Sequence, residues 1–401
     1  MRNRECFPTV DSSSPAAPWG LDPRVTMLNH GSFGACPRAV LQRQERLRRQ
    51  MEADPMRFFT REMEPLLDAS RQSLAELLSC DPADLVFVRN VTEAVNAVLR
   101  SLRFRPGDEI LVTDHAYNAC RNVVDYVAEC AGAKATVANI PVPIQEPGEI
   151  VAAILARVTA QTRLAMIDHV TSPTAVVFPI ESIVRALDEQ GVDTLVDGAH
   201  APGMVPLDLP RIGAAYYAGN CHKWLCSPVG AGFLHVRPDK QEGIHPAVIS
   251  HGFNRRRADR PRLHEEFDWT GTGDPTPWLC VGEAIRFLAM LDPGGIEGLI
   301  ERNHRMAVDA RRLLLGRAAF RPVCPEEMLG SMAAIDFGGE LSGASAPVHP
   351  LQAALWDRFG IEVPVYFWPA PPQLVLRISA QAYNARTDYE RLAEALETLL
   401  R

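Results

Sequence analysis

Two short stretches contain residues that could carry out covalent chemistry on an amine. Asp197 and His200 follow an apolar run at residues 192–196, and Lys223 lies between a histidine and a tryptophan a short way downstream. An apolar run that ends in a carboxylate is typical of a buried parallel strand whose carboxyl end opens into a site. A lysine in partly apolar surroundings can lose its proton and become a nucleophilic amine that forms a Schiff base.

Asp197 and Lys223 together indicate a site for pyridoxal phosphate (PLP). A carboxylate aimed at the pyridine nitrogen would keep that nitrogen protonated and make the ring an electron sink. Each residue also has an ordinary explanation, because Asp-Gly is a common turn and a lysine beside aromatic residues often lies at the surface. The order of the two stretches, and the residues around them, favour the PLP site.

Composition limits the class of protein. A chain of 401 residues predicts two domains, and its net charge of -8 argues against a nucleic-acid partner. No run approaches the roughly eighteen apolar residues that span a bilayer, and residues 1–20 lack the apolar segment of a secretory signal. The nine cysteines show neither paired spacing nor a zinc-type Cys/His cluster. We therefore expect a cytoplasmic protein with reduced thiols, no metal site and no membrane partner.

Strands and helices alternate through the middle of the chain. We expect strands at 85–88, 109–114, 135–140, 163–170, 192–196 and 230–236, separated by helices at 94–102, 118–131, 149–158 and 180–190. This alternation predicts an α/β fold with a parallel sheet covered on both faces, whose ligands bind at the carboxyl ends of the strands. Candidate residues fall at those ends: Thr92, 114–117, 171–174 and Asp197.

Thr92 follows the first of these strands, at the start of a helix. It could simply cap that helix. The free N–H groups and the dipole of a helix N-terminus also attract an anion, so a phosphorylated cofactor would make Thr92 part of a phosphate site.

The flanking regions have other patterns. Residues 1–20 are rich in Ser, Pro and Ala and predict a loose arm, and residues 28–34 form a Gly-rich turn without helical or strand period. Either Asn29 or His30 of this turn could approach a ligand. Residues 37–78 have helical periodicity throughout.

The C-terminal part predicts a second, α+β unit. It contains helices at 281–290, 295–315 and 387–400 and strands at 332–337 and 373–378. Arg377 is a single charge in an otherwise apolar strand. It could be paired in the core, or it could present its guanidinium to a substrate carboxylate.

Several motifs resemble one known family. They are residues 28–34, 90–94, 196–203, 218–225, 271–272, 377–379 and 383–384. From about Leu28 to its end, the chain resembles the class V aminotransferase family of fold-type-I PLP-dependent enzymes, and most closely the isopenicillin N epimerase-like branch. The resemblance implies a mostly parallel-sheet large domain at 61–280 and a smaller α+β domain at 281–401. Residues 21–60 would pack with the small domain.

The resemblance also implies roles around the cofactor ring. Lys223 would hold PLP and move the Cα proton, Asp197 would bind the pyridinium nitrogen, and His200 would lie near the phenolic oxygen. Either His115 or Tyr117 would stack on the ring, and the epimerase-like branch favours Tyr117.

Further residues would hold the rest of the cofactor. Val91, Thr92, Asn220 and His222 would bind the phosphate, and Thr272 would reach the phosphate of the neighbouring subunit in a homodimer.

A third group would form the substrate pocket. Arg377 would bind the substrate carboxylate, and Asn29, His30 and Tyr366, with Trp368, would line the pocket. Ser172 takes the place of an asparagine that desulfurases use near the ring oxygen.

The same resemblance bears on the reaction. Residues 346–376 lack the nucleophilic cysteine of class V desulfurases, so persulfide chemistry is not expected. We expect an epimerase-like enzyme that acts at the Cα of an amino acid or aminoacyl metabolite, with a carbon–sulfur lyase next and a transaminase third. A catalytically silent binding protein of this fold is the alternative from another class. Epimerisation would need an acid opposite Lys223, and Tyr117 and His30 are the candidates.

Overall fold

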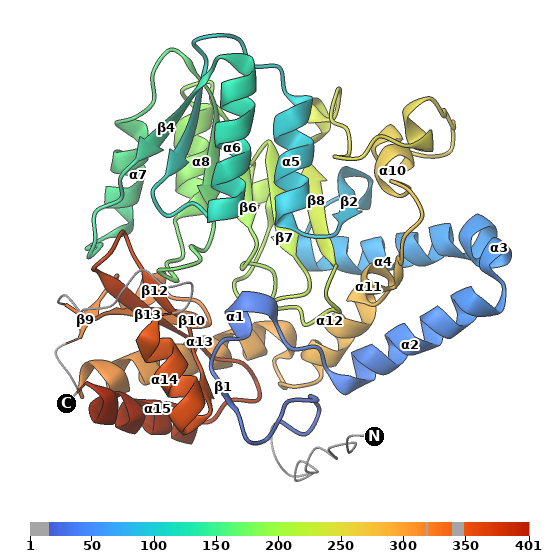
Figure 1. The fold of residues 1–401 in the computed structure, drawn as a ribbon. Coiled ribbons are helices and arrows are strands. Elements are labelled where there is room, and N and C mark those ends of the chain that lie inside the picture. Colours follow the sequence, from blue (N-terminus) through green and yellow to red (C-terminus); the bar gives the residue numbers. More distant parts are fainter. Residues whose placement is uncertain (1–15, 318–319, 339–348, 401) are drawn as a thin grey trace.

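A seven-stranded sheet forms the centre of the molecule (Figure 1). The computed structural model describes residues 16–317, 320–338 and 349–400. The strand order is β2-β8-β7-β6-β5-β3-β4, and all pairings from β7 to β4 are parallel, whereas β8 is antiparallel to both β2 and β7. The strands are β2 (Leu85–Val88), β3 (Glu109–Thr113), β4 (Lys134–Ala138), β5 (Thr162–Asp168), β6 (Asp193–Gly198), β7 (Tyr216–Asn220) and β8 (Gly232–Val236). The mostly parallel α/β sheet that the sequence predicts is thus confirmed.

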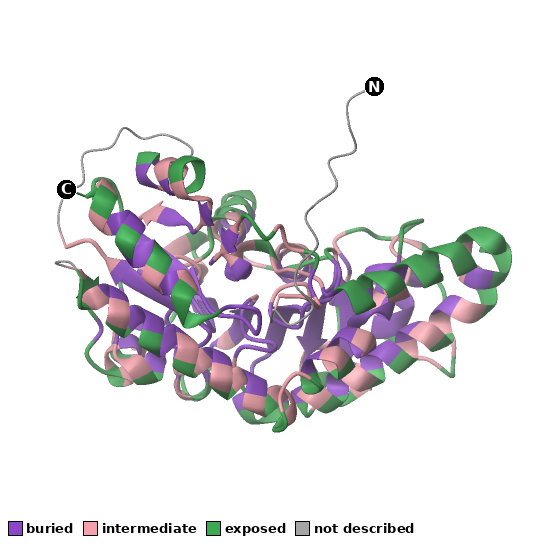
Figure 2. Cartoon of the chain, turned by 90° about the horizontal axis from the view of Figure 1, so that it is seen from below, coloured by how far each residue is buried: buried purple, intermediate pink, exposed green. Residues whose placement is uncertain are grey.

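Helices cover both faces of this sheet, as Figure 1 shows. On one face, α5 (Val91–Ser101) and α6 (Asn118–Ala131) bury Val98 and Val124 against β3 and β8. The other face carries α4 (Met63–Leu78), α7 (Pro147–Leu155) and α8 (Ile180–Asp188). The buried residues run through the sheets and along the inward faces of the helices (Figure 2). Because both faces are covered, only the ends of the strands remain open to a ligand.

A smaller antiparallel sheet lies toward the C-terminus, in the order β12-β13-β10-β9. Its strands are β9 (Arg321–Pro322), β10 (Met332–Asp336), β12 (Val365–Phe367) and β13 (Leu374–Ser379), and its helices are α13 (Gly295–Leu315), α14 (Pro350–Phe359) and α15 (Arg386–Leu399). The N-terminal β1 (Thr26–Met27) pairs with β11 (Ile361–Glu362). This pairing brings the residues after β1 beside the smaller sheet.

The N-terminal helical region differs from its expectation. Residues 38–78 are helical as expected except at Asp54, where the chain turns between α2 (Arg38–Ala53) and the short α3 (Pro55–Arg57), before a π-helical turn and α4. Pro55 has no N–H, and a proline disfavours helical angles in the residue before it, so Asp54 adopts φ -155° and ψ 84°.

Two other N-terminal expectations need correction. Residues 28–34 contain the short helix α1 (His30–Phe33) rather than a turn alone. The loose arm expected at 1–20 lies outside the described residues as far as residue 15, but Trp19 is buried and its ring contacts Tyr383 at 5.3 Å. Trp19 is therefore packed onto the C-terminal part. Of the described helices, none is both long and apolar enough to cross a membrane.

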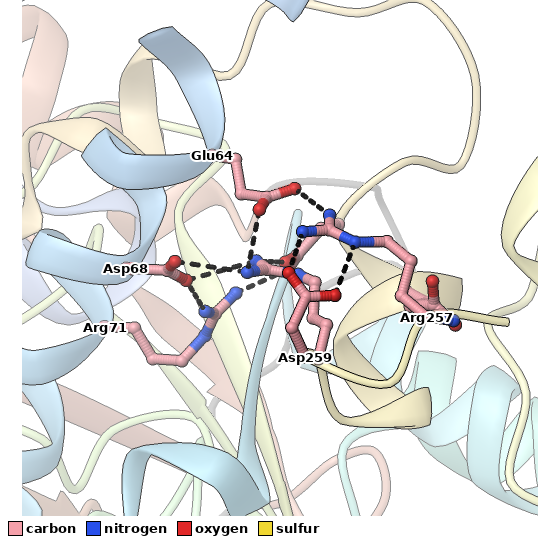
Figure 3. Close-up of polar contacts among 8 residues, drawn as sticks. Glu64, Asp68, Arg71, Arg257 and Asp259 are labelled. Atoms are coloured by element: carbon pink, nitrogen blue, oxygen red, sulfur yellow. Dashed lines mark hydrogen bonds and ion pairs between the residues drawn. The ribbon is translucent and has the colours of Figure 1, made fainter. Parts of the chain in front are cut away.

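A cluster of ion pairs joins α4 to α10 (Arg262–Phe267) and the loop before it (Figure 3). Arg71 of α4 is 1% exposed and binds Asp68 and, at 2.6 Å, Asp268. Arg260 binds the same two carboxylates, and Arg257 binds Glu64 and Asp259. Removing one buried partner from such a network leaves uncompensated charge. The cluster therefore fixes the position of the segment that leads to Thr272.

We expect Arg71→Met to lower the free energy of unfolding by about 3 kcal/mol, because two carboxylates lose their most buried partner while the apolar stem is kept. Urea denaturation measures the loss. The matched control is Arg305→Met, which removes an exposed pair with Glu301 and should cost less than about 0.5 kcal/mol. Equal small losses in the two variants would contradict a structural role for the cluster.

Candidate active site

Lys223 lies beyond the end of β7 and faces His200, which lies beyond the end of β6. The Lys223 Nζ is 3.1 Å from His200 Nε2, and the Trp224 indole N–H donates to His200 Nδ1 at 3.4 Å. Since an indole can only donate, the neutral His200 ring must carry its proton on Nε2. That N–H can bond to Lys223 only if the amine is neutral, because an ammonium group has no lone pair. The contact therefore selects the nucleophilic form of Lys223.

The electrostatics of the site act in the same direction. Burial and the charge of Arg377 lower the pKa of Lys223 to about 8. Burial, with the charges of Lys223 and Arg377, holds the pKa of His200 well below its usual range. Near neutral pH, His200 is thus uncharged, and far more of Lys223 is a free amine than of an ordinary lysine.

Asp197 is a buried carboxylate that forms no ion pair within the described parts of the chain. Its Oδ1 accepts from the N–H of Ala199 at 3.0 Å, and the Cys120 thiol also bonds to it. Burial raises the pKa of Asp197, and the nearby charge of Lys223 opposes that rise. A buried carboxylate of this kind calls for a cationic partner.

The N-terminus of α5 lies beside the same strand ends. The Val91 N–H donates to Asn220 Oδ1 at 3.0 Å, so these two groups, both expected at a phosphate, bond to each other instead. The amide NH₂ of Asn220 is then the group that remains for an anion. His222 donates through Nδ1 to the Ala231 carbonyl at 2.7 Å, which leaves its Nε2, and Thr92 occupies the first turn of α5.

The segment around α1 contacts the backbone of Lys223. His30 Nε2 donates to the Lys223 carbonyl at 3.0 Å, and its Nδ1 accepts from Tyr383 and from the N–H of Ala35. Both ring nitrogens are thus bonded to protein, and His30 positions Lys223 instead of offering a free group to a substrate. A Cβ at Gly34 would lie 2.3 Å from the His222 carbonyl, so this close approach requires glycine.

Arg377 lies in the centre of the smaller sheet and is 1% exposed. Its guanidinium donates to the Ser172 carbonyl at 2.6 Å, to Ser32 at 3.0 Å and to Asn29 at 3.2 Å, and it lies over the Tyr366 ring. No acidic side chain of the described residues forms an ion pair with it. Neutral acceptors orient the guanidinium without cancelling its charge, which suits a site for a carboxylate ligand.

The two candidates for the stacked aromatic differ in burial. His115 is 0% exposed, bonds to Thr174 at 2.7 Å and packs against the Trp368 ring at 4.5 Å. Tyr117 is 49% exposed, and its phenol lies within electrostatic range of Asp197 and Tyr366. The geometry favours Tyr117 as the residue that faces a ligand.

Other predicted and overlooked residues complete the arrangement. Ser172 accepts hydrogen bonds from Arg377, so it lies beside the residue that we expect to bind the substrate carboxylate. Thr272 is exposed on the loop after α10, and no described contact ties it to Lys223. Sequence reasoning did not single out Asp168 or Cys120, which lie beside Asp197. Asp168 is visible in the sequence within an expected strand, but its pairing with Asp197 on β6 depends on register.

These groups suit one ligand chemistry. Lys223 can react with an aldehyde, Asp197 can pair with a protonated ring nitrogen, and the start of α5 with Asn220 and His222 can bind a phosphate. Arg377 remains for a carboxylate on a second molecule.

Comparison with known proteins agrees with this geometry. The sequence profile of the family "Aminotransferase class-V" matches residues 34–344. The chain is 38% identical to an isopenicillin N epimerase from Streptomyces clavuligerus, over 94% of this chain and 96% of that protein. It is 32% identical to a probable chloroplastic L-cysteine desulfhydrase from Arabidopsis thaliana, over 95% of this chain and 84% of the other.

Solved structures share the fold at lower sequence identity. A variant of C-DES with glycine covalently linked to its PLP cofactor has a TM-score of 0.81 at 20% identity, over 97% of this chain and 99% of that one. A cysteine desulfurase from Escherichia coli has a TM-score of 0.77 at 22% identity, over 96% and 98%. The seven-stranded sheet and smaller C-terminal sheet are thus those of fold-type-I enzymes. By its sequence and its fold, this chain belongs to the class V aminotransferase family.

Proposed function

We propose that this protein is a PLP-dependent epimerase or racemase that acts at the Cα of an amino acid or of the aminoacyl arm of a larger metabolite. The observation that carries the proposal is that Lys223 contacts His200 and feels the charges of both Asp197 and Arg377, neither of which has an ion-pair partner among the described residues. Asp197 suits the ring nitrogen of a cofactor, and Arg377 suits the α-carboxylate of a substrate. The relatives named isopenicillin N epimerase support the same reaction type.

The chain's own residues divide the work. PLP, when bound, delocalises the electron pair left when the Cα proton is removed. Lys223 takes that proton on one face, because its lowered pKa leaves a free amine near neutral pH. Arg377 holds the carboxylate and so fixes which bond at Cα faces Lys223.

Epimerisation also needs a proton donor on the opposite face. Tyr117 is the best-placed candidate, because it is half exposed and lies near Asp197 and Tyr366. Burial and nearby acids raise the pKa of Tyr117, so its phenol is protonated at neutral pH and can donate. His30 does not serve, since both its ring nitrogens are bonded to protein.

A carbon–sulfur lyase is the second candidate. L-cysteine desulfhydrases are related at 29–33% identity, and lyases also begin by removing the Cα proton. The two reactions part at the next step, where a lyase expels a group from Cβ and an epimerase returns the proton to the other face.

We also propose a homodimer. Thr272 is exposed and has no described partner in its own chain, and it would reach the phosphate site of the second subunit.

The eight cysteines in the described residues are all free, which supports a reducing compartment such as the cytoplasm.

The proposal is tested by proton NMR of the purified, PLP-loaded enzyme in heavy water. Isopenicillin N and a panel of L-amino acids that includes L-cysteine serve as substrates. Exchange of the Cα proton with loss of optical activity, and no ammonia or keto acid, is the expected result. Pyruvate and ammonia would replace the epimerase proposal by the lyase. Lys223→Ala is the control, because it should abolish both outcomes.

The variant Tyr117→Phe distinguishes proton removal by Lys223 from proton delivery on the opposite face of Cα. We expect this variant to lose inversion by roughly a hundredfold or more, because the donor on the second face is gone. Lys223 should still exchange the Cα proton with retained configuration. The Cα proton signal should therefore disappear while the optical activity of the substrate is kept. Unchanged inversion in Tyr117→Phe would exclude Tyr117 as the second acid.

The reactivity of Lys223 can be measured without cofactor. In the apoprotein, the pH dependence of reductive methylation at Lys223, followed by mass spectrometry, should give a pKa of about 8. Arg377→Met should raise this pKa, because a positive neighbour that disfavours the ammonium form is removed. Asp197→Asn should lower it, because a negative neighbour is removed. The control Arg305→Met should change nothing; shifts of the same sign in both site variants would contradict the electrostatic argument.

A further inference from the structure

Two carboxylates lie side by side beneath the active site. Asp168 ends β5, and its Cα is the register partner of Asp197 on the parallel strand β6. Register partners on neighbouring strands point to the same face, about 4.8 Å apart. Both follow the alternation of Leu164, Met166 and Leu195, whose side chains belong to the core beneath α5 and α6. Both carboxylates are 4% exposed.

Neither carboxylate has a positively charged residue bonded to it among the residues that the structure describes. Asp168 accepts from the backbone N–H of Tyr117, and Asp197 accepts from Ala199 and Cys120. Two buried carboxyl groups this close cannot both ionise without a large cost, so the pair keeps a proton.

The surroundings decide which member keeps it. Burial and the adjacent Asp197 raise the pKa of Asp168 well above its usual range. Asp197 is the member that feels the positive charge of Lys223. The other titratable groups near the pair, Cys120 and Tyr217, have pKa values raised by burial and are neutral. Asp168 is therefore the neutral acid.

We propose that Asp168 is a positioning residue that stays protonated and donates a hydrogen bond to Asp197, so that Asp197 remains the ionised partner of the cofactor's ring nitrogen. The inference rests on the proposed function, because that nitrogen belongs to PLP. A donated hydrogen bond stabilises a carboxylate, and it does so here without a cation that would compete with the pyridinium. The pair thus presents one negative charge to the ring.

The test compares Asp168→Asn with Asp168→Leu. Asparagine keeps a neutral donor of the same shape, whereas leucine keeps the volume without the donor. The affinity of each apoprotein for PLP and for 1-deazapyridoxal phosphate, which lacks the ring nitrogen, is measured by absorbance titration at neutral pH. We expect Asp168→Leu to bind PLP roughly tenfold more weakly, and Asp168→Asn to stay within about threefold of the wild type. The deaza analogue should bind all three proteins alike.

Other results would overturn the inference. Unchanged PLP affinity in Asp168→Leu would mean that the two carboxyl groups are not coupled. An equal loss for both ligands would mean that leucine only distorts the site. An equal loss of PLP affinity in Asp168→Asn and Asp168→Leu would mean that the charge of Asp168, and not a donated hydrogen bond, supports binding.

Controls separate this inference from folding and from the proposed function. Thr113→Val removes another buried hydroxyl at the end of a neighbouring strand and should leave both affinities unchanged. Thermal unfolding confirms that each variant is folded. Wild-type protein that binds no PLP would overturn the proposed function as well, whereas normal wild-type binding with insensitive variants would overturn this inference alone.

Discussion

The burial of charge at one edge of the central sheet is the constraint on which the site depends. Asp197 and Arg377 are almost fully buried, and within the described residues neither has an ion-pair partner. Leaving such groups uncompensated costs several kcal/mol, and folding must supply that free energy from packing elsewhere. A charged ligand of the right shape recovers part of this cost on binding. Under the proposed function, the cofactor's ring nitrogen would offer a cation to Asp197, and the substrate's carboxylate would offer an anion to Arg377.

The fold brings these charges together from distant parts of the chain. Asp197 comes from the central sheet and Arg377 from the smaller sheet, and the α1 segment bonds to both Lys223 and Arg377. A Cβ at Gly31 would lie 2.5 Å from the Met332 sulfur, so a larger residue there would displace the Met332 side chain beside the guanidinium. The pairing of β1 with β11 fixes the segment from the other side. The carboxylate site is thus shared between elements, and movement of either sheet would alter it.

Part of this arrangement could be read from the sequence because it follows local periodicity. The helices α6 and α13 begin and end where the hydrophobic pattern places them. Tertiary contacts decided the rest. The strand β7 was not predicted, because Gly219 interrupts its apolar run. The structure shows why glycine is there: the Phe233 ring packs against the backbone at Gly219. The bond between Val91 and Asn220, and the pairing of Asp168 with Asp197, depend on strand register, which the sequence alone does not specify.

The reaction itself is decided by what opposes Lys223. The charges that activate the lysine serve an epimerase and a lyase equally, because both reactions begin with loss of the Cα proton. An epimerase needs, in addition, a group on the far face that is protonated when it delivers a proton to Cα. Tyr117 meets this condition, since its phenol keeps its proton, whereas a histidine with an ordinary pKa would be partly deprotonated. His30 is bonded to the protein through both ring nitrogens and His115 is fully buried, whereas Tyr117 is half exposed.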